Sequence, residues 1–342
     1  FSKIGTGVSV ERGGTTVYEY PEEVIRETIN NALAHRDYTS PRFSILRIRN
    51  NEYIEIRNPG KFRQEQIIIG EYPLKIRRII PIPKAQNPNL ADVLKAYKRW
   101  EGRGIGMATL TNFALNNLID VPYYRIYPEN EIGLFIPKGK VLDDNCIIWL
   151  NSFKKYILEK RKGKELTQEQ KTVLAYFYKS ERLNDVEKFT VNLTPDNNHF
   201  EAIRELEQCG LIDKLPISTI ELQIYSIDQT LKKTDFSSEL RNVYGGSFDN
   251  LNSDAQEVLE SIYHHNEFGL NSEVSANLIG NHLYFRKNNS INIDIKSFNN
   301  FVRKIRNTIN KLEIKGFIVR KNPNKPDYKI NVDFERTTSL FD

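Results

Sequence analysis

One helix-forming stretch near the start of the chain, EVIRETINNALAHRDY at residues 23–38, carries a carboxylate and a carboxamide four residues apart. Glu27 and Asn31 therefore lie one helical turn apart, on the side opposite an apolar stripe of Ile25, Ile29, Ala32 and Leu33. An amide oxygen is a ligand for Mg²⁺, and a carboxylate orients or deprotonates a water. The alternative is an ordinary solvated helix face, and Asn30, further round, is expected to be solvated or to cap a neighbour.

Two later motifs strengthen the chemical interpretation. RNPG at residues 57–60 ends a strand with the Asn58 amide and the turn glycine Gly60, which lets a flat ring approach the backbone. EGRGIG at residues 101–106 has three glycines directly before a helix, namely Gly102, Gly104 and Gly106. Backbone N–H groups in such a loop cradle phosphates, although the motif alone is equally typical of an ordinary surface loop. In this order, the three features predict a nucleotide-binding domain.

Alternating helix and strand patterns surround these motifs. The helix of residues 23–38 precedes two strands, FSILRIRN and EYIEIRNPG, around a tight turn at Asn50–Asn51. NLADVLKAYKRW and MATLTNFALNN have helical patterns on either side of the glycine loop, and YYRIY and IGLFIP are two strands that close the region near residue 138. This order predicts an α+β sandwich with helices on one face of a mixed sheet.

The same region resembles a known family. PEEVIRETINNALAHRDY, IEIRNPGKF, QNPNLADVL and EGRGIGM are similar to the GHKL (Bergerat-type) ATP-binding fold, and more narrowly to the branch in RecG-like, Schlafen AlbA-type putative transcriptional regulators. In those proteins the ATP-binding domain follows an AlbA-type domain and precedes winged helices. The chain starts at Phe1 and its one methionine is Met107, so we expect a fragment that lacks this front part.

The resemblance implies a role for each matching residue. It makes Glu27 the general base, Asn31 the Mg²⁺ ligand, Asn58 and Gly60 part of the adenine-contacting box, and Asn87 a lid residue. Gly102, Gly104 and Gly106 become the phosphate loop, and ATP with Mg²⁺ the cofactor. The wider fold has an aspartate where this chain has Asn58. An amide oxygen still accepts the adenine amino proton, but without the assistance of a charge.

The second half of the chain holds an approximate internal repeat. TQEQKTVL at residue 167 and SDAQEVL at residue 253 predict helices that start with a capping box, a hydroxyl residue with Gln three positions later. IRELEQCGLI and INKLEIKGFI each predict a helix that ends at a glycine, Gly210 or Gly316, and is followed by strands. We therefore predict two winged helix-turn-helix domains, at residues 141–230 and 251–342, after an ATP-binding domain at residues 1–140. Residues 231–250 are interpreted as a linker.

Positive charge is concentrated in the second copy. Residues 297–329 hold nine Lys or Arg and two acidic residues, a net +7 in a chain of net +5, so the rest is about −2. Such an excess indicates a polyanionic partner, and a groove-bound helix with a basic wing uses its cations to contact DNA phosphates. The predicted contacts are Arg303, Lys304, Arg306, Lys311, Arg320, Lys321 and Lys325. The alternative is a solvated basic face. The first copy has an acidic last helix, which favours packing or dimerisation.

Composition excludes several classes of protein. No apolar run approaches the roughly 20 residues of a membrane span, and the two cysteines, Cys146 and Cys209, form no disulfide framework and favour a reducing cytoplasm. The five histidines show no spacing typical of zinc ligands.

Together these features predict a nucleotide-regulated DNA-binding protein, a transcriptional regulator that binds ATP and Mg²⁺ and, as a homodimer, a twofold duplex site. The alternative is an ATP-hydrolysing enzyme coupled to DNA, helicase-related or defensive, in which Glu27 is the base. A degenerate fold that serves only as a dimerisation scaffold is a third possibility, against which the presence of both Glu27 and Asn31 argues.

Overall fold

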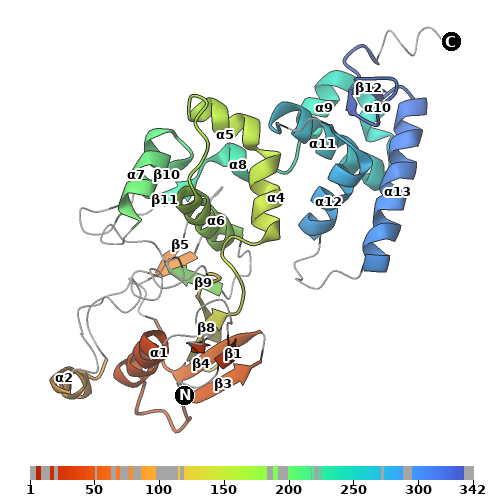
Figure 1. The fold of residues 1–342 in the computed structure, drawn as a ribbon. Helices are drawn as coiled ribbons and strands as arrows, with labels where there is room; N and C mark the ends of the chain where they lie inside the picture. Colours follow the sequence, from red (N-terminus) through yellow and green to blue (C-terminus); the bar gives the residue numbers. More distant parts are fainter. Residues whose placement is uncertain are drawn as a thin grey trace. The chain divides into compact units, whose positions relative to one another are not determined.

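A computed structural model shows a chain of mixed α and β structure (Figure 1). It describes residues 5–8, 16–18, 22–50, 52–62, 67–69, 77–79, 86–97, 115, 119–182, 188–191, 199–216, 218, 223, 225–270, 273–287 and 295–334. The chain divides into two compact units. The first comprises Phe1–Asp143, Thr167–Gln208 and Ile212–Ile227, and the second Asp144–Leu166, Cys209–Leu211 and Asp228–Asp342.

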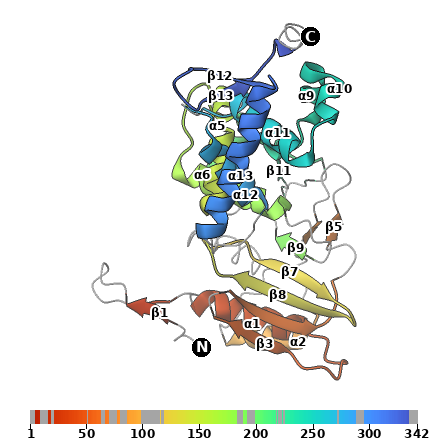
Figure 2. The same ribbon diagram turned by 90° about the vertical axis from the view of Figure 1, so that its right-hand side faces the viewer.

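A seven-stranded sheet, in the order β3-β4-β8-β7-β9-β6-β5, organises the first unit. Its strands are β3 (Ile45–Arg49), β4 (Tyr53–Pro59), β5 (Ile67–Ile69), β6 (Arg77–Ile79), β7 (Tyr123–Tyr127), β8 (Glu131–Pro137) and β9 (Lys188–Val191). All neighbouring pairs are antiparallel except β6 and β9. The two predicted hairpins are β3–β4 and β7–β8, and β4 pairs with β8 between them (Figure 2). Strands β1 (Gly5–Val8) and β2 (Thr16–Tyr18) form a separate antiparallel pair.

Helix α1 (Glu22–His35) covers one face of this sheet. Alternation along β4 and β8 directs Ile54, Ile56, Leu134 and Ile136 to that face, where Ile25, Ile29 and Ala32 of α1 pack against them. The predicted apolar stripe is therefore confirmed at these three positions. It is wrong at Leu33, which is 36% exposed, because that side chain lies about 100° round the helix from Ala32.

The other side of α1 is also covered. Thr28, Asn30 and Ala34 are buried, and helix α2 (Pro88–Ala96) packs against α1. Asn30 is thus not the solvated residue that the sequence indicates. Because α1 has neighbours on two sides, its polar positions are enclosed, and a wheel that assumes one buried face cannot predict this.

Helices dominate the remaining chain. They are α4 (Asp144–Ser152), α5 (Lys154–Lys160), α6 (Gln168–Arg182), α7 (Phe200–Gln208), α8 (Gln229–Lys232), α9 (Ser237–Tyr244), α10 (Gly246–Asp249), α11 (Ser253–Glu267), α12 (Ala276–Lys287) and α13 (Ile295–Ile314). Antiparallel hairpins follow α7 and α13, formed by β10 (Ile212–Lys214) with β11 (Tyr225–Ile227) and by β12 (Ile318–Arg320) with β13 (Tyr328–Ile330). No helix in the described part of the chain is long and apolar enough to cross a membrane.

The segment interpreted as a linker belongs to the core of the second unit. Leu240 and Tyr244 of α9 and Phe248 of α10 are buried in one cluster with α11, α12 and α13 (Figure 1). Tyr244 also donates a hydrogen bond to the carbonyl of Phe317 at 2.5 Å. The compact units divide the chain at other residues than the predicted domain boundaries, which stay predictions.

The predicted capping box is confirmed in the first copy of the repeat and is wrong in the second, while the glycine helix ends are confirmed in both. The amide of Thr167 donates to Gln170 Oε1 at 2.9 Å and the amide of Gln170 donates to Thr167 Oγ1 at 3.2 Å, which is the predicted capping box. In the second copy the cap is instead Asn252, whose Oδ1 accepts from the amide of Ala255. Gly210 and Gly316 have φ of +67° and +76°, the left-handed conformation expected after a helix end.

Candidate functional site

Asn58 ties strand β4 to helix α1. Its Nδ2 donates to the carbonyl of Ala32 at 2.7 Å, and its Oδ1 accepts from the hydroxyl of Ser44 at 2.6 Å. The carbonyl of Ala32 is one of the last four in the helix, which have no acceptor role inside it. Both ends of the amide are therefore used within the fold. An amide oxygen has two lone pairs, so one remains for a further donor.

Asn87, like Asn58, donates hydrogen bonds to carbonyls at the C-terminal end of α1. Its Nδ2 donates to the carbonyls of Ala34 and Arg36 at 3.1 and 2.7 Å, and its backbone amide donates to Ala34 at 3.0 Å. Its own carbonyl accepts from Ala91, in the first turn of α2. Asn87 therefore caps the end of α1 and starts α2, and both hydrogens of its amide group are engaged.

Gly60 follows β4 at the same end of α1. Its φ is +146°, in the region that favours glycine, and a Cβ placed there would lie 3.5 Å from the carbonyl oxygen of His35. That distance is an ordinary contact, so the backbone conformation, rather than lack of space, requires glycine. The structure thus brings Asn58, Gly60 and Asn87 together around the C-terminal end of α1.

Asn31 differs from these residues. It is half-buried on α1, and its side chain has no hydrogen-bond partner among the residues that the structure describes. The backbone of Glu27 lies one turn earlier in α1, while its side chain is outside the described part. Gly102, Gly104 and Gly106 also lie outside the described residues.

Asn31 and Asn58 have atoms that could contact a bound nucleotide with Mg²⁺, whereas the side-chain amide hydrogens of Asn87 are already used within the fold. The Asn31 amide has an oxygen that is available for Mg²⁺, and Asn58 keeps one acceptor position. Asn87, in contrast, has committed its amide hydrogens to the end of α1. No group of three or more His, Cys, Asp or Glu side chains in the described part of the chain is placed to hold a metal ion.

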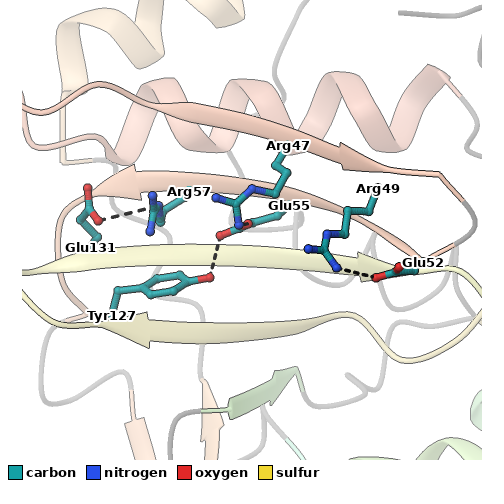
Figure 3. A network of polar contacts seen from close by, with 7 residues as sticks. All are labelled: Arg47, Arg49, Glu52, Glu55, Arg57, Tyr127 and Glu131. Carbon is teal, nitrogen blue, oxygen red and sulfur yellow. Dashed lines mark hydrogen bonds and ion pairs between the residues drawn. The ribbon is translucent and has the colours of Figure 1, made fainter. Parts of the chain in front are cut away.

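The face of the sheet that does not contact α1 carries a charged network (Figure 3). At its centre the fully buried Glu55 accepts hydrogen bonds from Arg47 at 2.9 Å and from the Tyr127 hydroxyl at 2.7 Å. Burial, and then the Glu55 carboxylate, raise the pKa of Tyr127 to about 12. Gly133 permits this contact, because a Cβ there would lie 2.9 Å from the Tyr127 ring.

Arginines extend the network toward β8. The guanidinium of Arg57 lies 4.8 Å from the centre of the Tyr127 ring, and its Nε is 3.7 Å from Glu131. Arg49 pairs with Glu52 at 3.2 Å at the other end of the hairpin. This network is not among the features that the sequence analysis predicts. The pattern that indicates it is the alternation of the polar residues Tyr53, Glu55 and Arg57 with Ile54 and Ile56 along one strand.

The second candidate site is the solvent face of α13. Val302, Ile305, Ile309 and Leu312 are buried, and the basic residues between them are exposed. Arg303, Lys304, Arg306, Lys311 and Lys315 form no ion pair with any residue in the described ranges. Four of these five are predicted DNA contacts, and Lys315 is an addition from the structure. A helix with this many uncompensated cations carries a strong local positive potential.

The predicted contacts in the hairpin are placed differently. Arg320 makes two hydrogen bonds to the Glu313 carboxylate, at 2.7 and 3.1 Å. Lys321 lies 3.4 Å from Asp327, and Lys325 lies 3.2 Å from Glu273. All three are exposed, but each already has an acidic partner. A count of basic residues in the sequence gives each of them the same weight, and it does not predict which of them form ion pairs.

Close packing fixes the position of α13. Gly280 of α12 faces Val302, and a Cβ at Gly280 would lie 2.9 Å from a Val302 methyl group. On the other side of the unit, the amide of Tyr328 in β13 donates to the carbonyl of Val274, just before α12. The residues around Val274 thus join the hairpin to the helices, so that α11, α12, α13 and the hairpin form one body.

Comparisons with known proteins add little to this geometry. No family model matches the chain, and no curated protein matches it. Among solved structures it is similar to the DIP2311 protein from Corynebacterium diphtheriae, with 15% identity over 91% of this chain and a TM-score of 0.33. This chain spans 50% of the length of that one. A superposition of this quality establishes neither a shared fold nor a shared function.

Proposed function

We propose that this chain is a DNA-binding protein that contacts duplex DNA through the exposed face of α13 and responds to ATP with Mg²⁺ at α1. The observation that carries the DNA part is the set of five exposed basic side chains on α13 and directly after it without ion-pair partners in the described residues. Each such cation that contacts a phosphate releases a counterion, which makes binding favourable and salt-dependent.

The arrangement around α13 supports a winged helix-turn-helix domain. Helices α11, α12 and α13 share one core, and the β12–β13 hairpin follows α13 directly. In proteins of this kind the last helix enters the major groove and the wing contacts the backbone. The exposed Asn307 and Asn310 lie between the basic residues of α13, where amide side chains are suited to base edges.

Charge reversal tests the DNA part. We expect Arg303→Glu/Arg306→Glu to lose at least 100-fold in affinity for a duplex oligonucleotide, measured by fluorescence anisotropy, because each reversal replaces an attraction to phosphate by a repulsion. The matched control is Lys164→Glu/Lys214→Glu, an equal change in net charge at exposed residues that are not part of α13. Equal losses in both variants, or no binding by the unmodified protein, would contradict the proposal.

The nucleotide part rests on Asn31 and on the resemblance of its surroundings to an ATP-binding fold. We expect ATP with Mg²⁺ to raise the melting temperature of the unmodified protein, since a ligand that binds the folded state stabilises it, and Asn31→Ala to abolish the shift. Asn89→Ala, at an exposed position of α2, is the control. Absence of a shift in the unmodified protein would refute nucleotide binding, and a shift that survives Asn31→Ala would refute the assignment of Asn31.

A further inference from the structure

A groove of about 520 Å³ lies beside the C-terminal half of α13, against the start of α11. Three lysines line it, Lys304 and Lys311 of α13 and Lys315 directly after the helix. They recur at helical spacing and so form one stripe along the helix. Arg303 and Arg306 do not line the groove, so α13 presents its basic residues on two sides.

The wall opposite the lysines is polar. Asn250 and Asn252 line it, and Asn252 caps the first turn of α11. The remaining N–H groups of a helix start carry a partial positive charge. Between the two walls, the buried residues Ala255 and Leu312 form the floor and hold α11 and α13 in contact.

The groove has an excess of positive charge that the described residues leave uncompensated. Three lysines face one carboxylate, that of Asp254, and none of the lysines forms an ion pair with a described residue. Two other exposed lysines of this unit do have acidic partners, Lys287 with Glu257 at 2.5 Å and Lys325 with Glu273 at 3.2 Å. Like charges that line one concave surface repel each other unless an anion binds between them.

We propose that this groove binds a phosphate group. Lys304, Lys311 and Lys315 supply the charge, and the amides of Asn250 and Asn252 with Asn307 supply hydrogen-bond donors of the kind phosphate oxygens accept. The phosphate belongs either to the backbone of a duplex that flanks the α13 contact or to a free phosphate compound. The inference deepens the proposed function, because these three lysines also belong to the basic set proposed to contact DNA, but binding of a free phosphate compound tests it without the contact through Arg303 and Arg306.

Tripolyphosphate is a suitable probe for the free form. We expect the full chain to bind it in a calorimetric titration at constant ionic strength, and Lys304→Ala/Lys311→Ala/Lys315→Ala to weaken binding at least tenfold. Lys164→Ala/Lys171→Ala/Lys214→Ala removes the same charge at residues outside the groove and should change the affinity less than twofold. Asp254→Asn should strengthen binding, because it removes the one acidic group lining the groove.

Duplex DNA identifies the source of the phosphate. If the groove holds a backbone phosphate, the lysine variant lowers the slope of log K against log salt by about 0.9 for each lost contact. If the slope is unchanged while tripolyphosphate binding is lost, the ligand is a free phosphate compound. An unmodified protein that binds tripolyphosphate but no duplex would refute the proposed function and leave the groove assignment intact. Equal affinity of the unmodified and lysine variants for both probes would overturn the inference.

Discussion

The polar end of helix α1 and the basic face of helix α13 differ in what their side chains already contact. Around α1, the amides of Asn58 and Asn87 are bonded to helix carbonyls and to Ser44. On α13, Arg303, Arg306 and their neighbours are exposed and have no acidic partner among the described residues. The first region uses polar groups to hold the fold together, whereas the second leaves them available for a ligand.

Substitutions in the two regions should therefore affect different quantities, the free energy of unfolding near α1 and the affinity for DNA on α13. Substitutions at the engaged residues should lower the free energy of unfolding whether or not a ligand is present, because they leave carbonyls at the end of α1 without a donor. Substitutions on α13 should leave stability nearly unchanged and act on DNA affinity. The comparison fails if the two groups of variants behave alike.

The largest effect on stability is expected from two buried histidines of α11, His264 and His265. Burial lowers the pKa of His264 to about 3 and that of His265 to about 4. Each is neutral when folded and takes up a proton on unfolding below the ordinary value of 6.5, so stability falls as the pH is lowered through this window and levels off below the folded values. The slope rises from about half of 1.4 kcal/mol per pH unit for each histidine at pH 6.5 to nearly the full value at pH 5, so we expect a loss of roughly 3 kcal/mol over this range.

Urea unfolding at pH 7, 6 and 5 measures this loss. His264→Leu, which keeps an apolar side chain beside Phe153 and Phe236, should reduce the pH dependence by about half. A stability that does not change over this range would show that the two histidines are not buried in the neutral form.

Glu55 gives the next largest effect. Glu55→Ala removes a fully buried carboxylate and leaves Arg47 and the Tyr127 hydroxyl without their partner, which should cost about 3 kcal/mol in the free energy of unfolding. Glu52→Ala is the matched control, because its pair with Arg49 is exposed and should contribute little to the free energy of unfolding. Both variants should bind DNA normally once folded, and equal losses of stability would contradict the assigned burial of Glu55.

Asn87→Ala should lower the free energy of unfolding by less than Glu55→Ala does. It removes the hydrogen bonds to the carbonyls of Ala34 and Arg36, and the loss of a helix cap typically costs about 1–2 kcal/mol. Thermal unfolding without nucleotide should show this loss, while Asn89→Ala, on the exposed side of α2, should show little. A loss confined to the nucleotide-bound protein would instead assign Asn87 to the ligand site.

Much of the fold could be predicted because it depends on local sequence. The β3–β4 and β7–β8 hairpins follow from alternation, the Thr167 capping box from residue spacing, and Gly316 from the need for a left-handed residue after α13. The insertion of β9 between β7 and β6 could not be predicted, because that pairing joins residues far apart in the chain. The supposed linker could have been recognised as helical, since Leu240, Tyr244 and Phe248 recur at intervals of four.

The sequence indicates which residues belong to the candidate sites, but it does not indicate which partners their side chains contact. The resemblance implies that Asn58 contacts adenine and that Asn87 belongs to a lid, whereas their bonds to the end of α1 depend on which carbonyls lie within reach. The basic stretch was evident from composition, but only the structure distinguishes Arg320, which pairs with Glu313, from Arg306, which is unpaired among the described residues. Likewise, the groove exists only because α11 packs against α13.

Paired and unpaired cations should differ in a smaller but measurable way. Arg320→Ala breaks an exposed pair with Glu313 and should lower the free energy of unfolding only slightly, whereas Arg306→Ala should change it even less. In duplex binding, Arg306→Ala should lower the affinity more than Arg320→Ala does. The reason is that an arginine already bonded to a carboxylate must exchange that partner for a phosphate. A greater loss of affinity for Arg320→Ala would assign the main contact to the hairpin.

The salt dependence of duplex binding tests the central claim most directly. We predict that the slope of log K against log salt is shallower by about 2 for Arg303→Ala/Arg306→Ala than for the unmodified protein, with about 0.9 lost per phosphate contact, while Lys164→Ala/Lys214→Ala keeps the original slope. A slope that is the same in all three proteins would show that the exposed face of α13 does not contact DNA.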